Sequence, residues 1–137
     1  MNNLDGIGIA VRNIVRSDLP NKIKFPFTPD HDQGGYISLC HWSGCWNIRG
    51  LVFSILNCGL HREKYYLLSR QNILDIVDTL NDLYHHPKMW GNSIWKYDEI
   101  KNSLKIDINN LTKLYRFLIL HPKNDIQVYF YDNDYRL

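Results

Sequence analysis

Residues 64–86 read KYYLLSRQNILDIVDTLNDLYHH, and this stretch carries the strongest structural pattern of the chain. Lys64–Leu68 has the residue types of a short strand. Ser69 follows at the position of a helix N-cap, whose side chain accepts hydrogen bonds from free backbone amides. Apolar residues then recur three and four positions apart on one helix face, at Ile73, Ile76, Val77, Leu80, Leu83 and Tyr84. The stretch predicts a strand followed by a capped helix that ends at His85-His86-Pro87.

The segments on either side continue this alternation of strands and helices. In chain order, the expected elements are a strand at 36–41, a helix at 45–56, a strand at 64–68, a helix at 70–85, a strand or helix at 93–97, a helix at 108–118 and a strand at 125–131. Asp107 stands where it can cap the last helix, which ends near His121-Pro122. The order predicts an α+β (or α/β) fold, a mixed four- to five-stranded sheet covered by about three helices.

The first 35 residues differ from the rest in composition. An apolar stretch, Ile7–Val11, precedes a segment that contains three prolines and the pair Gly34-Gly35. This pattern is typical of an early strand or arm followed by a looping segment. A chain of 137 residues is the size of one compact domain. We therefore expect an N-terminal arm and loop segment at 1–35 and a single α+β core domain at 36–137.

The charge balance and the cysteine count exclude several classes of protein. The chain has 16 Lys and Arg against 14 Asp and Glu, a net charge of +2, without the clusters that nucleic-acid binding needs. We expect no stable nucleic-acid binding. No apolar run approaches the length of a membrane span, and the N-terminus lacks the pattern of a secretory signal. Three cysteines, an odd number, fit reduced thiols better than disulfides. We therefore expect a cytoplasmic protein.

Metal and catalytic sites are weakly indicated. Cys40, Cys45, Cys58 and His61 offer ligand types that suit zinc, but their spacing argues against a zinc site, so we predict no metal and no cofactor. A small hydrolase that uses His41 or His61 is a third functional class. No set of base, nucleophile and orienting residue can be named for it, so we predict no catalytic residues.

Arg49 lies among aromatic residues where the strand at 36–41 passes into the next helix. On a helix that begins near Trp42, positions 42, 46, 49 and 53 are neighbours on one face. A guanidinium beside aromatic faces gains roughly 0.5–2 kcal/mol and keeps its fork available for an anion. We predict a site for a nucleotide-like ligand, formed by His41, Trp42, Trp46, Asn47, Arg49 and Phe53. The alternative is that both tryptophans are core residues and Arg49 extends along them to solvent, which needs no ligand.

Aromatic residues make up 13% of the chain, more than a core of this size usually needs. Tyrosine, tryptophan and arginine are enriched at protein interfaces. A second candidate surface, for a partner protein or for homo-oligomerisation, therefore consists of Trp90, Trp95, Tyr129, Tyr131 and Tyr135. The alternative is that these are the exposed edges of ordinary core residues.

The order of residues in 36–131 carries a resemblance. His41-Trp42, Cys45, Ile48, Arg49 and Leu51-Val52-Phe53 follow one another, and Tyr65-Tyr66-Leu67-Leu68-Ser69 and a helix come next. This resembles a family of small phage and prophage proteins with the stretch Tyr-Trp-Arg-Lys-Ala-Asn-x-Ile-His-x-Trp-Phe-Val, then a Tyr-Tyr-Val-Ser strand and cap and a Leu-rich helix. Ser43-Gly44 stands here for the Arg-Lys pair, Trp46 for the Asn and Arg49 for the His.

The resemblance implies a phage-encoded accessory protein in the host cytoplasm, of a class that often acts against host defence or on host metabolism. Combined with the site above, it leads us to expect a protein that binds and sequesters a small, anionic, nucleotide-like molecule without turnover. The alternative function is a module that inhibits a host protein through an aromatic surface.

Overall fold

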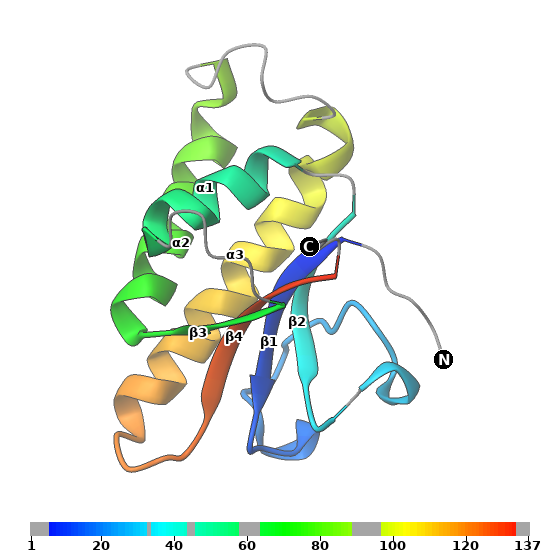
Figure 1. The fold of residues 1–137 in the computed structure, drawn as a ribbon, viewed down its shortest axis with the longest axis vertical. Helices are drawn as coiled ribbons and strands as arrows, with labels where there is room; N and C mark the ends of the chain where they lie inside the picture. The colour runs from blue at the N-terminus through cyan, green and yellow to red at the C-terminus, as the bar shows by residue number, and fades with distance from the viewer. Residues whose placement is uncertain (1–5, 33, 44–45, 58–63, 89–96, 134–137) are drawn as a thin grey trace.

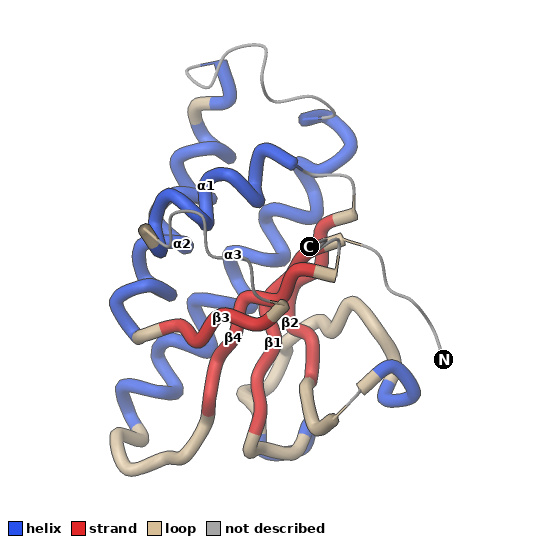
Figure 2. The backbone as a smooth tube through the Cα atoms, in the orientation of Figure 1, coloured by secondary structure: helices blue, strands red, loops and turns tan. Residues whose placement is uncertain are grey.

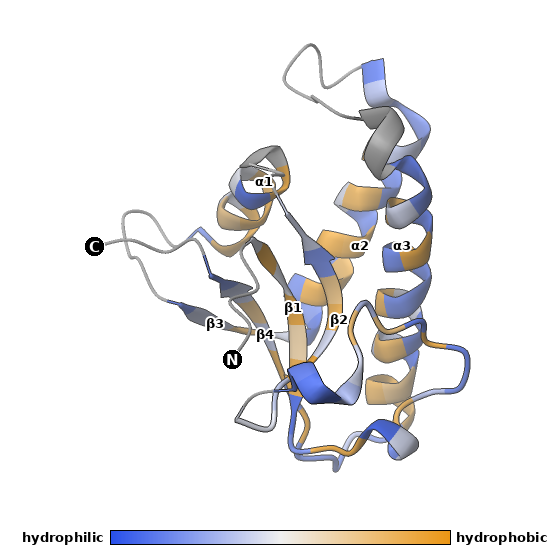
Figure 3. Cartoon of the chain, turned by 90° about the vertical axis from the view of Figure 1, so that its right-hand side faces the viewer, coloured by the Kyte–Doolittle hydropathy of each residue, from blue (hydrophilic) through white to orange (hydrophobic). Residues whose placement is uncertain are grey.

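The computed structural model describes residues 6–32, 34–43, 46–57, 64–88 and 97–133. The elements are β1 (Ile7–Arg12), β2 (Ile37–Trp42), α1 (Trp46–Leu56), β3 (Tyr65–Leu68), α2 (Arg70–His85), α3 (Tyr97–Leu120) and β4 (Gln127–Asp132). The strands form one sheet of order β2-β1-β4-β3 (Figures 1 and 2). Helices α2 and α3 run beside one face of it, and α1 lies above its upper end in Figure 3. The predicted small α+β domain is confirmed. Each neighbouring pair of these strands is antiparallel, so the sheet is not mixed in this part.

Strand β1 lies in the middle of the sheet, paired with β2 on one side and with β4 on the other. The early strand expected at Ile7–Val11 is confirmed, and it belongs to the same sheet as the strands of residues 36–137. Ile7, Ile9 and Val11 are almost fully buried and belong to the main hydrophobic core. A strand with a neighbour on both edges and an apolar face under helices cannot be removed without opening that core.

The core lies between the sheet and the helix layer. Buried side chains of all four strands form one cluster with apolar residues of the helices. Figure 3 shows apolar segments of α2 and α3 beside the sheet. In α1, Phe53 packs edge-on against the rings of Tyr66 in β3 and Phe130 in β4. The residues of α2 that are buried are Ile73, Ile76, Leu80 and Leu83. This agrees with the helix face that the sequence predicts.

Helix α2 begins with reciprocal capping. The Ser69 hydroxyl accepts the backbone N–H of Asn72 at 3.0 Å, and the Asn72 side chain accepts the backbone N–H of Ser69 at 3.0 Å. Two of the donors left free at a helix start are thus satisfied. The predicted N-cap at Ser69 and the predicted end of the helix at His85 are both confirmed.

Helix α3 begins at Tyr97, so Asp107 lies in its middle and does not cap it. This corrects the prediction of a shorter helix. The Asp107 side chain is buried and accepts the indole N–H of Trp42 at 2.8 Å. The sequence points to a cap because Asp is common before an apolar helix, whereas the indole that occupies this carboxyl is 65 positions away in the chain. Of the predicted strand or helix at 93–97, only Tyr97 lies within the described residues, and it is helical.

Burial favours the protonated form of both Asp107 and its neighbour Cys40. Burial raises the pKa of Asp107 to about 7, against the opposing effect of the Trp42 hydrogen bond. Burial, and then the nearby Asp107, raise the pKa of the Cys40 thiol well above its ordinary range. Cys40 therefore stays a protonated thiol, which is a poor nucleophile.

Asn110, one turn further along α3, joins the helix to a bulge in β2 and to the loop before it. Ile9 pairs with Cys40 and Ala10 pairs with Ser38, so Leu39 is an extra residue in the ladder. Its carbonyl oxygen accepts a bond from the Asn110 amide at 3.0 Å. The same side chain accepts the backbone N–H of Lys24 at 3.1 Å and donates to its carbonyl at 2.9 Å. One buried amide thus satisfies three backbone groups in two segments.

Asp107→Asn should change how stability depends on pH. The folded protein holds the Asp107 proton up to about pH 7, whereas an unfolded chain releases it near pH 3.8. Between these values the folded state binds more protons, so the free energy of unfolding falls as the pH rises through this window. At about 1.4 kcal/mol per unit of pKa shift, the fall amounts to a few kcal/mol.

Asparagine keeps an oxygen for the Trp42 N–H and does not ionise, so the variant should lose most of this dependence. Urea unfolding at pH 4 to 8 measures it. Asp78→Asn, on an exposed side chain of α2, is the control and should follow the wild type. If Asp107→Asn kept the pH dependence of the wild type, the raised pKa of Asp107 would not be its cause, and the prediction would be wrong.

Candidate functional site

The predicted stripe of Trp42, Trp46, Arg49 and Phe53 does not form on one helix face. Trp42 is the last residue of β2, is 2% exposed and points into the core toward Asp107. The helix begins only at Trp46, so Trp42 cannot share its face. The alternative, that Trp42 is a core residue, is confirmed. Trp46 and Asn47 lie in the first turn of α1, and their side chains lie outside the described part of the structure.

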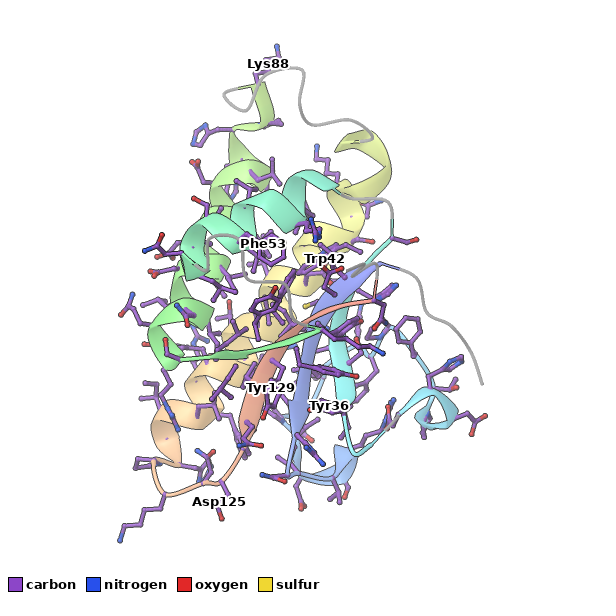
Figure 4. The ribbon with its side chains drawn as sticks, in the orientation of Figure 1. Tyr36, Trp42, Phe53, Lys88, Asp125 and Tyr129 are labelled. Carbon is purple, nitrogen blue, oxygen red and sulfur yellow. The ribbon has the colours of Figure 1, made fainter. Side chains whose placement is uncertain are left out.

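Arg49 binds a carboxylate of its own chain. Its Nε and Nη2 donate to Oδ2 of Asp132 at 2.9 and 2.7 Å, and the Asp132 side chain is fully buried. The guanidinium carbon of Arg49 lies 4.6 Å from the ring centroid of Phe53, a residue that is labelled in Figure 4. An anionic ligand at Arg49 would have to compete with Asp132 and leave that carboxylate buried without its counter-charge, which is costly. The geometry therefore argues against Arg49 as the phosphate-binding residue.

A different group of aromatic residues meets on the face of the sheet that carries no helix. Tyr36 immediately precedes β2, Tyr65 is in β3, and their rings stack with centroids 4.4 Å apart and planes 10° apart. Tyr129 in β4 lies edge-on to both, at 5.3 and 6.2 Å (Figure 4). We call Tyr36, Tyr65 and Tyr129 the tyrosine cluster.

The stacking of Tyr36 on Tyr65 requires a curled sheet. Strands β2 and β3 are the two opposite edges, about 14 Å apart at the usual strand spacing in a flat sheet. Figure 1 shows β3 at a steep angle to β1 and β2, as a strong twist requires. The two edges therefore lean toward one another above the helix-free face, and Ala10 of β1 is only 2% exposed.

Two cations accompany the tyrosine cluster. The guanidinium carbon of Arg12 lies 5.0 Å from the ring centroid of Tyr36, and Nζ of Lys64 lies 5.8 Å from that of Tyr65. Because each ring has one face against the other, each cation lies over the outward face of its tyrosine. Both cationic residues are exposed. Burial, and then Tyr36, raise the pKa of Tyr65, while Arg12 opposes the shift.

Tyr131 lies across the sheet beside this cluster. Its phenol oxygen is 2.7 Å from Nδ1 of His41 and 2.8 Å from Oγ of Ser38, both in β2 on the far side of β1. The ring passes over Gly8, where a Cβ atom would overlap the phenol and the Cys40 carbonyl oxygen. Tyr131 is 6% exposed, and burial raises its pKa far above the ordinary range. Tyr131 is therefore a neutral supporting residue and not an exposed contact.

The predicted partner surface is thus only partly described. Tyr129 lies on the helix-free face as part of the tyrosine cluster, whereas Tyr131 is buried, which corrects its prediction as a surface residue. Trp90, Trp95 and Tyr135 lie outside the described residues. The sequence did not indicate Tyr36 and Tyr65 as site residues. Tyr36 lies just before β2 and Tyr65 lies in β3, at opposite edges of the sheet, and only the curl of the sheet brings them together.

Metal binding and membrane insertion find no structural counterpart in the described ranges. No group of three or more His, Cys, Asp or Glu side chains there is placed to hold a metal ion. Of the zinc-like set, Cys40 is buried, and Cys45, Cys58 and His61 lie outside those ranges. No described helix combines the length and the apolar character needed to cross a membrane.

Three comparisons of the chain with known proteins gave no match. No family model matches the chain, and no match was found among curated proteins or among solved structures. The resemblance to small phage proteins stays a prediction.

Arg49→Met should destabilise the protein by about 3–5 kcal/mol, because it removes the guanidinium that pairs with the fully buried Asp132 carboxylate. Adding Asp132→Asn should recover part of the loss. Arg16→Met breaks a pair in which both side chains are partly exposed, so it should cost less than Arg49→Met. Chemical denaturation measures all three variants. Equal losses of stability in Arg49→Met and Arg16→Met would contradict the expectation that the ion pair with the fully buried carboxylate contributes more.

Gly8→Ala and Gly50→Ala should have opposite effects. At Gly8 the new methyl group would displace Tyr131, so we expect a loss of about 1–3 kcal/mol or more. At Gly50, in the middle of α1, nothing lies within 4 Å of the new Cβ, and alanine should stabilise the helix by about 0.5–1 kcal/mol. Urea unfolding compares the two. Unchanged stability in Gly8→Ala would contradict the placement of Tyr131.

Proposed function

We propose that this protein binds a planar, anionic, nucleotide-like ligand on the tyrosine cluster. The observation that carries the proposal is the order Arg12, Tyr36, Tyr65, Lys64, in which two stacked rings have a cation over each outward face. Aromatic rings beside exposed cations are the combination that binds a base and its phosphate. The role moves from the predicted Arg49 site to the helix-free face, because Arg49 already pairs with Asp132.

The arrangement suggests how such a ligand would bind. A base stacks on the outward face of Tyr36 or Tyr65 and takes the place of the cation there. Stacking of one base on an aromatic ring contributes about 1–3 kcal/mol. The displaced Arg12 or Lys64 has a long, flexible side chain and turns to the phosphate. Tyr129 supports both rings from the side, so the platform does not depend on the ligand for its order.

Binding without turnover agrees with what surrounds the cluster. Cys40 is a buried thiol, and the Tyr131 phenol is buried and neutral. The Tyr131 phenol lies beside the His41 imidazole, but burial keeps it protonated and therefore a poor nucleophile. Sequestration of a host signal by a phage accessory protein stays a prediction from the resemblance, and cytoplasmic location stays one from the sequence.

Titration with the four ribonucleoside 5′-monophosphates, followed by isothermal calorimetry and by tyrosine signals in NMR spectra, tests the proposal. We expect at least one to bind. Arg12→Ala and Lys64→Ala, both at exposed positions, should each weaken binding several-fold and reduce its salt dependence. Tyr65→Leu should weaken it at least tenfold.

Arg116→Ala, at an exposed position of α3 in the helix layer, is the matched control and should bind as the wild type does. Absence of binding by all four nucleotides at millimolar concentration would overturn the proposal. So would a full loss in Arg116→Ala together with unchanged binding in Arg12→Ala.

A protein partner is the second candidate, favoured by one observation. Leu67 of the edge strand β3 is 61% exposed and pairs with Tyr129, so it adds an apolar side chain to the same face. A protein interface would use Leu67, whereas a nucleotide on the tyrosine rings would not. Leu67→Ser should therefore leave nucleotide binding unchanged, and loss of a copurifying partner in this variant would support the second candidate.

A further inference from the structure

A second aromatic group lies on the same face, at the β2 edge. The ring of Phe27 is 5.4 Å from that of His31 and 4.9 Å from that of His41, and we call these three residues the Phe27 group. Phe27 and His31 belong to the loop before β2, and His41 belongs to β2 itself. Both rings from the loop are only partly buried.

Arg16 holds this loop in place. Its Nε and Nη2 donate to the two carboxylate oxygens of Asp32 at 2.8 Å each, and Nη2 also donates to the Phe27 carbonyl oxygen at 3.1 Å. The guanidinium carbon lies 4.4 Å from the ring centroid of Phe25. A bidentate ion pair that also binds the backbone fixes both position and direction. The Phe27 ring is therefore set before any ligand arrives, which reduces the entropy lost on binding.

Tyr131 connects the Phe27 group with the tyrosine cluster. His41, Gly8, Tyr131 and Tyr65 lie opposite one another in the four strands, so they form one row across the helix-free face. The rings of His41 and Tyr131 lie 5.8 Å apart and nearly parallel, at 21°. The row crosses all four strands, so His41 with the Phe27 group and Tyr65 lie on opposite edge strands and offer two separate places for a planar base. A ligand with a single base would use one end of it.

We infer that the ligand carries two planar bases joined through phosphate, one stacked on the tyrosine cluster and the other on the Phe27 group. The inference rests on the proposed function and names the class of its ligand. Arg12 and Lys64 supply positive charge at the tyrosine end. A free dinucleotide and the end of a longer single strand share this chemistry, and the experiment separates them by length.

The experiment compares the four monophosphates, the corresponding nucleoside diphosphates, the 5′-phosphorylated homodinucleotides and the homo-octanucleotides by calorimetry at one salt concentration. The dinucleotide should bind at least tenfold more tightly than the monophosphate of the same base. The diphosphate has the second phosphate without the second base, so it should gain much less. An octanucleotide that binds much more tightly than the dinucleotide assigns a longer strand, and equal affinity assigns a free dinucleotide.

Two variants locate the second base. Phe27→Ala should lower dinucleotide affinity about tenfold and leave monophosphate affinity unchanged, and His31→Ala should act in the same direction with less effect on the fold. Phe117→Ala removes a matched ring, which lies 4.5 Å from His121 in the helix layer, and should change neither affinity.

Equal affinities for monophosphate and dinucleotide would overturn the two-base inference and leave the proposed function intact. Equal gains by dinucleotide and diphosphate would overturn it as well, since charge alone would then explain the difference. Absence of binding by every probe would overturn both the inference and the proposed function.

Discussion

Strand β1 has bulky apolar side chains on one face and almost none on the other, and both layers of the protein depend on this difference. Ile7, Ile9 and Val11 fill the core under the helices. Gly8 and Ala10, on the other face, leave room for the ring of Tyr131 to cross the strand. A larger residue at Gly8 would raise that ring and separate it from His41 and Ser38. The central strand therefore sets the thickness of the core and the shape of the open face together.

The helix layer and the loop before β2 are held by polar side chains placed inside α3. Asp107 receives the Trp42 indole, and Asn110 satisfies the bulge at Leu39 and both backbone groups of Lys24. Each of these bonds joins segments that are far apart in the chain. Buried polar groups without partners destabilise a fold, so satisfied ones favour one arrangement of helix against sheet. This arrangement keeps the loop at the β2 edge, where Arg16 then positions Phe27.

The two arginines near aromatic rings illustrate why position in the fold decides function. Arg49 lies over Phe53, but its guanidinium neutralises the buried Asp132, and its role is structural. Arg12 lies over Tyr36 at an exposed position beside a second stacked ring. The same pairing of cation and ring thus lies against a buried carboxylate at one place and at an exposed position at the other. Within the described residues, Arg49 pairs with a carboxylate and Arg12 does not, and this makes the difference.

The sequence by itself determined several helices and strands. The spacing of apolar residues and the Ser69 cap define α2, and the alternation after Asp125 defines β4. These signals can be recognised because they depend on neighbours a few positions away. Tertiary structure alone decided that 7–12 is the central strand, that Asp107 and Trp42 are partners, and that Tyr36 meets Tyr65. These contacts join residues that are tens of positions apart, and the sequence near each residue gives no sign of its partner. They depend on the strand order and on the curl of the sheet. The sequence by itself predicted a surface rich in aromatic residues around Trp42 and Arg49, whereas the structure buries Trp42 and pairs Arg49 with Asp132. Which side of the sheet stays open is a property of the assembled layers.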